Sequence, residues 1–429
     1  MAFVVRWAKT IRNNWKKSTF AACALAYGVS YAKDKYEINN LMREYCEEAK
    51  IYGDQLLPIP HEPKRVIVIL NPAANKKKAK ETFESYAEPI LHLGGFLVEI
   101  VKTDSEGHAR RYVEDLPKLP SAILVAGGEG TLSEAVTGLC RRAPHERCPI
   151  GVLPVGRTNS VAKKIFNVVN PSKVQNVEAL ANAAISVVRE QVEPRDTMKI
   201  EIIDQETQPK PVYAVGSLKW GAFRDIMSKR DKYWYFGGLR DYSAFLFNAF
   251  SDDITWQCKA SLEFTDPCSG CRNCRVNFQP PKPQNKRWWS IFVPRSKPVI
   301  VGPDFSKIEN PNCSVTHQLE VAPTEFEVIT RNLEDDDAKL PHLKIQLGKE
   351  GEEGFTFMTN SWSRVWNRLP LTPEKTIDAR SVVIRPAVES TEDKELYYSI
   401  DNENYEVKPI RVSVEPDAIN MYVMKKTSS

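Results

Sequence analysis

The sequence predicts an α/β domain followed by an all-β domain, with an N-terminal helix that anchors the chain in a membrane. Hydrophobic strands alternate with amphipathic helices between residues 61 and 194, whereas short strands follow one another from residue 195 onward. Residues 1–33 carry basic side chains and no acidic one. We therefore expect a leader and connector at 1–60, an α/β domain at 61–194 and a β-sandwich domain at 195–429.

The composition is that of a folded chain with two domains. A length of 429 residues suits two ordinary domains. A hydrophobic content of 42% and a charged content of 27% are close to globular averages, so most of the chain should fold around a core. The net charge of +4 does not indicate a nucleic-acid-binding protein. Nine cysteines in so long a chain do not indicate a disulfide scaffold.

The leader joins a basic stretch to a short apolar one. Residues 18–32 are uncharged and mostly apolar, and the cations before them are Arg6, Lys9, Arg12, Lys16 and Lys17. Crossing a bilayer takes roughly 17–25 apolar residues, so this run is short unless its flanking lysines snorkel. The apolar part of a secretory signal would lie nearer the start. We interpret the leader as mitochondrial targeting with an uncleaved anchor. The alternative is a surface helix with one apolar face.

The α/β domain begins with a strand at residues 65–72, because an apolar, β-branched run that stops sharply is typical of a buried parallel strand. Further strands are expected at 96–103, 121–128 and 148–156. Helices are expected between them at 79–94, 105–116 and 131–142. Strands and helices that alternate at this spacing form stacked βαβ units, so we expect a Rossmann-like sheet.

The second domain is expected to contain short strands without intervening helices. The strands are expected at 197–203, 212–220, 260–265, 326–332, 343–348, 381–387, 396–401 and 410–416. This pattern predicts an antiparallel sandwich. An insertion at 266–298 is rich in Pro, Lys and Asn, and we expect it to be a mobile loop.

Two features of the insertion leave alternatives open. Cys268, Cys271 and Cys274 have the spacing C-x₂-C-x₂-C, which suggests zinc. A closed zinc site takes four ligands, and no fourth Cys or His lies close by in the sequence. Residues 286–297, "KRWWSIFVPRSK", combine aromatic side chains with cations, as membrane-interface segments do. The alternative for this segment is a solvated loop.

A glycine turn follows the third expected strand, within "AILVAGGEGTLSEAV" at residues 122–136. Loops at the carboxyl ends of parallel strands face the ligand crevice of such a sheet. Glycines there let the backbone approach phosphate oxygens, and the helix that follows offers free N–H groups. The turn has neither the Walker A spacing nor G-x-G-x-x-G. Alone, it is equally consistent with a tight turn before a helix.

Two more polar loops strengthen the phosphate-site interpretation. "NPAAN" at 71–75 follows the first strand, and "LPVGRTNS" at 153–160, which contains Gly156, follows the fourth. The carboxyl ends of parallel strands meet at one edge of a sheet, so we expect the three loops to converge. The lysines at 76–78 are interpreted as a solvated run.

The sequence contains three motifs in the order NPxx, GGxGTxxE and PxGxxN. This order resembles that of the catalytic domain shared by diacylglycerol kinases, sphingosine kinases and ceramide kinase. Within that family the similarity is strongest to the acylglycerol kinases of mitochondria, also called multi-substrate lipid kinases. It extends over nearly the whole chain and is weaker between residues 250 and 380. The segments that carry it include "LNPAANKKKAKETFE", "VKTDSEGHARR", "AGGEGTLSEAVTG", "KWGAFRDIMSKRDKYWYFGGLR" and "SIDNENYEVKPIRV".

The resemblance implies a kinase that uses ATP and Mg²⁺ to phosphorylate the hydroxyl of monoacylglycerol or diacylglycerol, with ceramide and sphingosine as further candidates. It implies a place at the mitochondrial inner membrane, with the catalytic body facing the intermembrane space. It also implies association with subunits of the carrier translocase. We therefore keep a second hypothesis, a scaffold subunit of that translocase whose kinase site is vestigial. A soluble relative of NAD kinase or phosphofructokinase is a third, which the leader and "KWGAFRD" disfavour.

The resemblance also assigns roles to individual residues. The nucleotide would be bound by Asn71, Thr103, Gly127, Gly128, Gly130, Thr131, Gly156 and Arg240. Asp225 would bind the polar head of the lipid. The catalytic carboxylates would be Glu129, Asp401 and Glu403, with Mg²⁺ bound through Glu129 or Asp401. An alternative for Asp401 is a hairpin-turn residue, because Asp-Asn suits such turns.

The chain departs from the family pattern at several loop positions. Glu129 stands where the family has aspartate, and one extra methylene displaces a carboxylate by about 1 Å, which can cost on the order of 100-fold in rate. Asn75 and Lys77 occupy positions usually held by glycine. Asn402 replaces the glycine of a D-G-E motif, although asparagine tolerates positive φ. These changes motivate the scaffold hypothesis.

Overall fold

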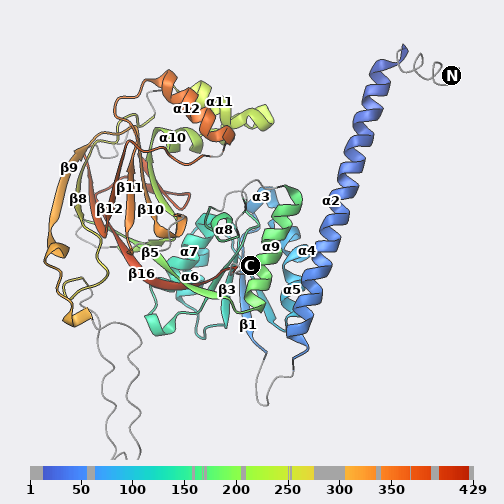
Figure 1. Ribbon diagram of the computed structural model, residues 1–429, viewed down its shortest axis with the longest axis horizontal. Coiled ribbons are helices and arrows are strands. Elements are labelled where there is room, and N and C mark those ends of the chain that lie inside the picture. The colour runs from blue at the N-terminus through green and yellow to red at the C-terminus, as the bar shows by residue number, and fades with distance from the viewer. Residues whose placement is uncertain are drawn as a thin grey trace, which may run out of the picture. The chain divides into compact units, whose positions relative to one another are not determined.

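The computed structural model describes residues 13–55, 63–156, 160–166, 168, 172–203, 209–249, 251, 254–274, 305–334, 340–367, 369–387 and 396–424. The chain forms two compact units (Figure 1). Unit 1 comprises 1–132, 146–193 and 420–429, and unit 2 comprises 133–145 and 194–419. The segment 286–297 lies outside the described residues.

Unit 1 contains a parallel sheet in the order β2-β1-β3-β4. Its strands are β1 (Arg65–Leu70), β2 (Leu97–Lys102), β3 (Ala122–Ala126) and β4 (Ile150–Leu153). The last residues of β16 (Ile410–Tyr422) add to β4 in parallel. Every residue of β3 and β4 is buried, as apolar strands covered on both faces require. The four predicted strands and the α/β class of this unit are confirmed.

Helices cover both faces of this sheet (Figure 1). They are α3 (Ala74–Lys77), α4 (Ala79–Tyr86), α5 (Glu88–Leu93), α6 (His108–Glu114), α7 (Glu129–Cys140), α8 (Ser160–Ile165) and α9 (Lys173–Val188). The helix expected at 79–94 is two helices, because the chain bends at Ala87 and Pro89 occupies the first turn of α5. The sequence interpretation missed α8 and α9. Helix α9 begins at a capping box formed by Ser172 and Gln175.

The N-terminal helix α2 (Trp15–Gly53) packs on α5 and α9 through its carboxyl-terminal half (Figure 1). The Arg189 guanidinium donates to both carboxylate oxygens of Glu48, at 2.6 and 2.8 Å. In the other half, residues 19–33 are all exposed, so the apolar segment at 18–32 is helical but unpacked. None of the described helices has both the length and the hydropathy to cross a bilayer.

Unit 2 contains a six-stranded sheet and the antiparallel part of a ten-stranded sheet, around a shared apolar core. The first is antiparallel throughout, in the order β12 (Lys375–Ala379), β11 (Leu343–Leu347), β10 (Glu325–Thr330), β7 (Ser217–Gly221), β14 (Tyr397–Ile400) and β15 (Glu403–Glu406). The second has the order β16, β13 (Ser381–Pro386), β8 (Ala260–Thr265) and β9 (Thr316–Val321), with β5 (Val192–Ile202) and β6 (Val212–Ala214) joined through β16. Side chains such as Leu218, Phe326, Val382 and Val412 fill the space between the two layers, and the predicted antiparallel strands of this unit are confirmed.

The expectation of strands without intervening helices is wrong for unit 2. It contains α10 (Ala222–Ser228), the 3₁₀ segment η2 (Arg230–Leu239), α11 (Arg240–Asn248) and α12 (Gly354–Asn367). These helices share a second apolar core, in which the ring of Phe245 lies 6.3 Å from that of Phe357. Short 3₁₀ turns occur at η1 (Pro144–Glu146), η4 (Phe305–Lys307), η5 (Pro311–Ser314) and η6 (Arg331–Leu333).

Candidate functional site

The loops after β1, β2 and β3 are held together at the carboxyl edge of the unit 1 sheet. The backbone N–H of Asn71 donates to the carbonyl of Ala126 at 3.0 Å. The N–H of Thr103 donates to the carbonyl of Leu70 at 2.9 Å. The polar loops therefore begin side by side, as parallel strands dictate.

The side chain of Asn71 joins the first loop to the glycine turn. Its Nδ2 donates to Oγ1 of Thr131 at 3.1 Å, and its Oδ1 accepts the N–H of Ala73 at 3.0 Å. Thr131 is buried in the first turn of α7. Asn71 thus fixes both its own loop and the amino end of the helix that follows the glycines.

Two glycines allow the loops after β3 and β4 to touch. A Cβ on Gly156 would lie 2.7 Å from the carbonyl oxygen of Gly127 and 2.9 Å from Cα of Gly128. A Cβ on Gly127 would lie 2.9 Å from Oγ1 of Thr131. Only glycine permits such close backbone packing. The structure therefore brings together the three polar loops that the sequence singled out.

Glu129 is the first residue of α7 and its side chain is buried at 6% exposure. Its Oε1 accepts hydrogen bonds from both the backbone N–H and Oγ of Ser160, the first residue of α8. The carboxylate thus lies near the amino ends of two helices, where negative charge is favoured. Sequence reasoning missed Ser160, although "NS" before a helix is a usual start signal.

The first loop has a left-handed backbone where the family pattern has glycine. Asn75, Lys76 and Lys77 have φ values of 52°, 55° and 68°. Such a conformation costs non-glycine residues roughly 1–2 kcal/mol each. The side chains of 76–78 are exposed, so the lysines are solvated as expected.

Asp225 is buried in α10 of unit 2. Its Oδ1 accepts Nη1 of Arg224 at 2.8 Å and its Oδ2 accepts the N–H of Thr255 at 2.9 Å. Nη2 of Arg224 also donates to Oδ1 of Asn404 at 2.5 Å. Arg224 therefore connects the residue predicted to bind the lipid head with the β14–β15 hairpin. The sequence analysis assigned no role to Arg224.

Asp401 and Asn402 form the two-residue turn between β14 and β15, with φ of 45° and 67°. The buried carboxylate of Asp401 accepts the N–H groups of Val215 at 2.8 Å, Gly216 at 3.0 Å and Ser217 at 2.8 Å. The hairpin-turn interpretation is confirmed, and the contacts give Asp401 a structural role. Its catalytic role, like that of the neighbouring Glu403, stays a prediction.

Arg240 begins α11 and forms ion pairs with Asp231 at 3.3 Å and Asp241 at 3.2 Å. Its side chain is 17% exposed. A guanidinium has five N–H donors, so these two contacts leave others for a phosphate. Helix α11 contacts α10, so Arg240 and Asp225 belong to the same helical cluster.

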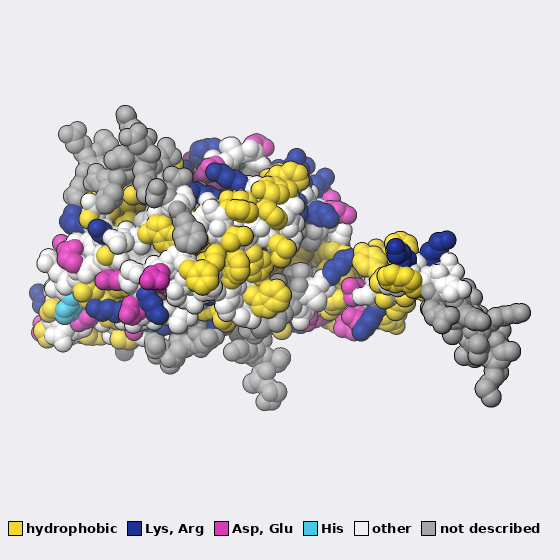
Figure 2. Space-filling model, turned by 90° about the horizontal axis from the view of Figure 1, so that it is seen from above, with side chains coloured by type: hydrophobic (Ala, Val, Ile, Leu, Met, Phe, Trp, Pro, Cys, Tyr) yellow, Lys and Arg dark blue, Asp and Glu magenta, His cyan; other side chains and the backbone are white. Residues whose placement is uncertain are grey.

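Large apolar side chains are exposed on that cluster. They are Trp234, Tyr235, Phe236, Leu239, Leu246, Phe247 and Trp366, and we call them the aromatic surface. Figure 2 shows hydrophobic side chains gathered on this face, with Lys and Arg at its margins. The rings of Phe236 and Phe247 lie 5.9 Å apart. An exposed patch of this kind marks an interaction site.

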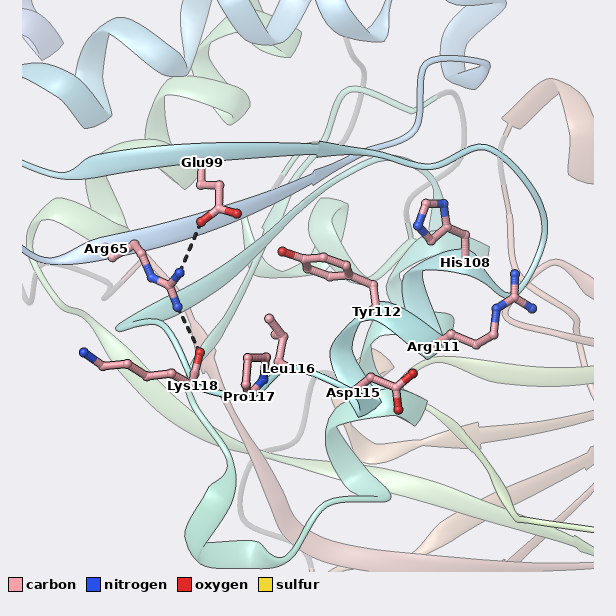
Figure 3. A pocket seen from close by; sticks show the side chains of 9 residues that line it. All are labelled: Arg65, Glu99, His108, Arg111, Tyr112, Asp115, Leu116, Pro117 and Lys118. Atoms are coloured by element: carbon pink, nitrogen blue, oxygen red, sulfur yellow. Dashed lines mark hydrogen bonds and ion pairs between the residues drawn. The ribbon is translucent and has the colours of Figure 1, made fainter.

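A separate pocket of about 590 Å³ lies at the amino end of β1 (Figure 3). There Arg65 forms an ion pair with Glu99 at 3.2 Å and donates to the carbonyl of Lys118 at 2.9 Å. Burial, together with the Glu99 carboxylate, raises the pKa of Tyr112. Parallel sheets bind ligands at their carboxyl ends, and Arg65, which lines this pocket, lies at the other end of β1 from Asn71. We therefore assign it no role in the candidate site.

Comparison with known proteins agrees with this arrangement. Residues 65–200 match the family described as diacylglycerol kinase catalytic domain, and residues 215–429 match acylglycerol kinase C-terminal. The chain is 33% identical over 436 residues to a mitochondrial acylglycerol kinase of Xenopus laevis, covering 97% of this chain and 94% of the relative. It is 33% identical over 420 residues to that of Homo sapiens, covering 96% and 95%.

A solved structure agrees with the fold. A putative diacylglycerol kinase from Bacillus anthracis str. Sterne has a TM-score of 0.51 at 15% identity, over 85% of this chain and 99% of that one. At this identity the likeness shows the fold alone. Because both family matches and relatives 33% identical extend along nearly its whole length, the chain belongs to the acylglycerol kinase family of lipid kinases, whose catalytic domain implies the use of ATP.

Proposed function

We propose that this protein transfers the terminal phosphoryl group of ATP to the hydroxyl of monoacylglycerol or diacylglycerol. The observation that carries the proposal is the glycine turn at 127–131, packed against Gly156 and tied to Asn71. Its backbone and the amino end of α7 suit phosphate oxygens, because free N–H groups and the helix dipole favour negative charge. The products are lysophosphatidic and phosphatidic acid.

Within this turn, Glu129 is the carboxylate best suited to orient or deprotonate the lipid hydroxyl. Phosphoryl transfer depends mainly on positioning and on the stabilisation of charge, and bound Mg²⁺ supplies part of that charge. Both oxygens of Asp401 already accept amide hydrogens, so Asp401 fits a metal ligand less well than Glu129 does. Ser160 would hold the Glu129 carboxylate in place.

The lipid would reach the protein from a membrane through the aromatic surface. Trp and Tyr side chains favour the membrane–water boundary, and Lys229, Arg230 and Lys232 beside them suit anionic headgroups. Arg240 lies on α11, which carries part of this surface, and Asp225 lies on α10, which packs on α11. The exposed apolar half of α2 supports a second membrane contact. Relatives named mitochondrial support a mitochondrial membrane as the location.

The test is phosphate transfer from labelled ATP to monoacylglycerol and diacylglycerol in mixed micelles with Mg²⁺. The wild type is compared with Glu129→Asp and Glu129→Gln. Glu81→Gln is the matched control, because Glu81 is an exposed glutamate on α4. We expect turnover by the wild type and the control, activity at least as high for Glu129→Asp, and a loss of at least about 100-fold for Glu129→Gln.

The same assay tests the scaffold hypothesis. The left-handed residues at 75–77 and the engagement of Glu129 by Ser160 favour that hypothesis, since both restrict the phosphate loops. If the wild type and Glu129→Gln are equally inactive while Glu129→Asp is active, the chain is a kinase fold silenced at one residue. The function would then lie with its membrane partners, such as carrier-translocase subunits. If none of the three is active, the proposed function is wrong.

A further inference from the structure

Four thiols of unit 2 gather at one end of the β8–β9 strand pair. They belong to Cys268, Cys271, Cys274 and Cys313, and we call them the thiol cluster. The strands are antiparallel, with Thr265 at the end of β8 opposite Thr316 at the start of β9. Three of the cysteines follow β8, and the fourth lies in η5, directly before β9. Strand pairing therefore places beside the C-x₂-C-x₂-C motif the fourth ligand that the sequence analysis did not find.

The spacing of the sulfur atoms suits a metal ion at their centre. All four lie within 4.8 Å of one another, and Sγ of Cys271 is 3.6 Å from Sγ of Cys274. Zinc binds thiolates at about 2.3 Å, so neighbouring sulfurs of a tetrahedral site are about 3.8 Å apart. A disulfide needs about 2.05 Å, and the four cysteines are free.

The cluster is buried, and N–H donors point at two of its sulfurs. Cys271 is fully buried, and Cys313 is 2% exposed. The N–H of Cys271 donates to Sγ of Cys274 at 3.2 Å, and Nδ2 of Asn310 donates to Sγ of Cys268 at 3.4 Å. Amide donors of this kind surround the ligands of metal sites and fix their orientation.

A cation and a constrained turn complete the site. Nη2 of Arg380 donates to the carbonyl of Cys313 at 3.4 Å, and its buried Nε has no hydrogen-bond acceptor among the described residues. Four thiolates around a divalent ion leave a net negative charge, which a guanidinium would offset. Gly270 has φ of 120°, and a Cβ there would lie 2.3 Å from the Phe305 ring. The turn between the first two cysteines therefore requires glycine.

We propose that the thiol cluster binds one Zn²⁺ ion, which closes the base of the long connection between β8 and β9. Four protein ligands leave no open position, so the site is structural and not catalytic. Sulfur-only tetrahedral sites take zinc or iron, and we assign zinc because this location calls for no redox chemistry. None of the four cysteines belongs to the residues assigned to phosphoryl transfer, so the two proposals can fail separately.

The test is elemental analysis of the full-length chain, purified in detergent without chelators under reducing conditions. We expect one zinc per chain and a several-fold loss in Cys271→Ser and Cys313→Ser. Cys46→Ser, a change to a partly buried cysteine in unit 1, is the matched control and should keep its zinc. Cys274→His should also keep it, because imidazole replaces thiolate as a zinc ligand.

A second measurement uses the wild-type chain, so its result does not depend on whether the cysteine variants fold. Wild-type chain stripped of metal is titrated with Co²⁺, whose visible absorption identifies tetrahedral thiolate coordination. The expected result is one such Co²⁺ per chain, displaced by Zn²⁺. Iron in place of zinc, two disulfides in the mass spectrum of chain purified without reductant, or zinc retained by every Cys→Ser variant would overturn the proposal.

Discussion

The side chain of Glu129 is one methylene longer than the aspartate usual in its turn, and its carboxylate contacts Ser160. The carboxylate accepts two hydrogen bonds from Ser160, so it links the loop after β3 to the helix that follows β4. The residues at 75–77 depart from the pattern in another way, since they hold a left-handed conformation that favours glycine. The sequence departs from the family pattern in both places, with different physical consequences.

We expect Asp401 to stabilise unit 2 through its carboxylate, and this effect can be measured apart from any role in catalysis. In Asp401→Ala, three N–H groups at 215–217 lose their acceptor, and each unsatisfied buried donor costs about 1–3 kcal/mol. We expect the unfolding free energy of unit 2 to fall by at least about 3 kcal/mol. The measurement is chemical denaturation followed by tryptophan fluorescence, since Trp220 lies in the core of that unit.

Glu406→Ala is the control for this change. Glu406 is an exposed carboxylate on the same hairpin, and its ion pair with Lys408 lies at the surface. Surface ion pairs contribute about 0–1 kcal/mol, so the control should unfold nearly as the wild type does. A stable Asp401→Ala variant that has lost only its kinase activity would show that the residue acts in catalysis instead.

Elements differ in how well the sequence predicts them, and burial explains the difference. Strands such as β1 and β3 consist mostly of apolar, often β-branched residues, so they can be predicted from the sequence without knowledge of the tertiary structure. Helix α9 is buried along most of its length, so it shows no polar stripe of helical period. Helix α12 contains Thr, Asn and Ser that resemble a loop, and it was missed although Met358, Trp362 and Val365 have the spacing of one helical face.

We expect the aromatic surface, which lies on η2, α11 and α12, to bind the membrane that presents the lipid. The double variant Trp234→Ser, Phe247→Ser loses two large exposed rings from the proposed membrane contact. We expect the apparent KM for diacylglycerol in phosphatidylcholine vesicles to rise by about tenfold or more, since burying one such ring contributes about 1.5–3 kcal/mol. The KM for ATP should change much less, because neither ring belongs to the residues assigned to the nucleotide.

Leu340→Ser is the control, because Leu340 is 48% exposed and lies outside this surface. Its KM for vesicle lipid should match the wild type. Equal KM values for the double variant and the wild type would mean that the lipid enters elsewhere.

At the scale of the whole molecule, the two candidate sites differ in how far they could be inferred. The three polar loops of the candidate phosphate site all follow strands of one parallel sheet, and a general rule places the carboxyl ends of such strands together. The site could therefore be predicted from the order of motifs alone. The thiol cluster depends on the pairing of β8 with β9, and no sequence rule reveals that Cys313 lies beside Cys271. Ser160 was missed for the same reason, since its role appears only in contact with Glu129.

The division into two units predicts that ATP and zinc stabilise different parts of the chain. Hydrogen exchange followed by mass spectrometry measures this for the full-length protein with ATP, with a zinc chelator and with neither. ATP should slow exchange at 71–75 and 127–132, and the chelator should speed it in β8 and β9, because a ligand protects the elements that bind it. Each unit has its own apolar core, so the change should not spread to the other. If the chelator loosened unit 1 as much as β8 and β9, the zinc ion would not be a local clamp and the units would not be independent.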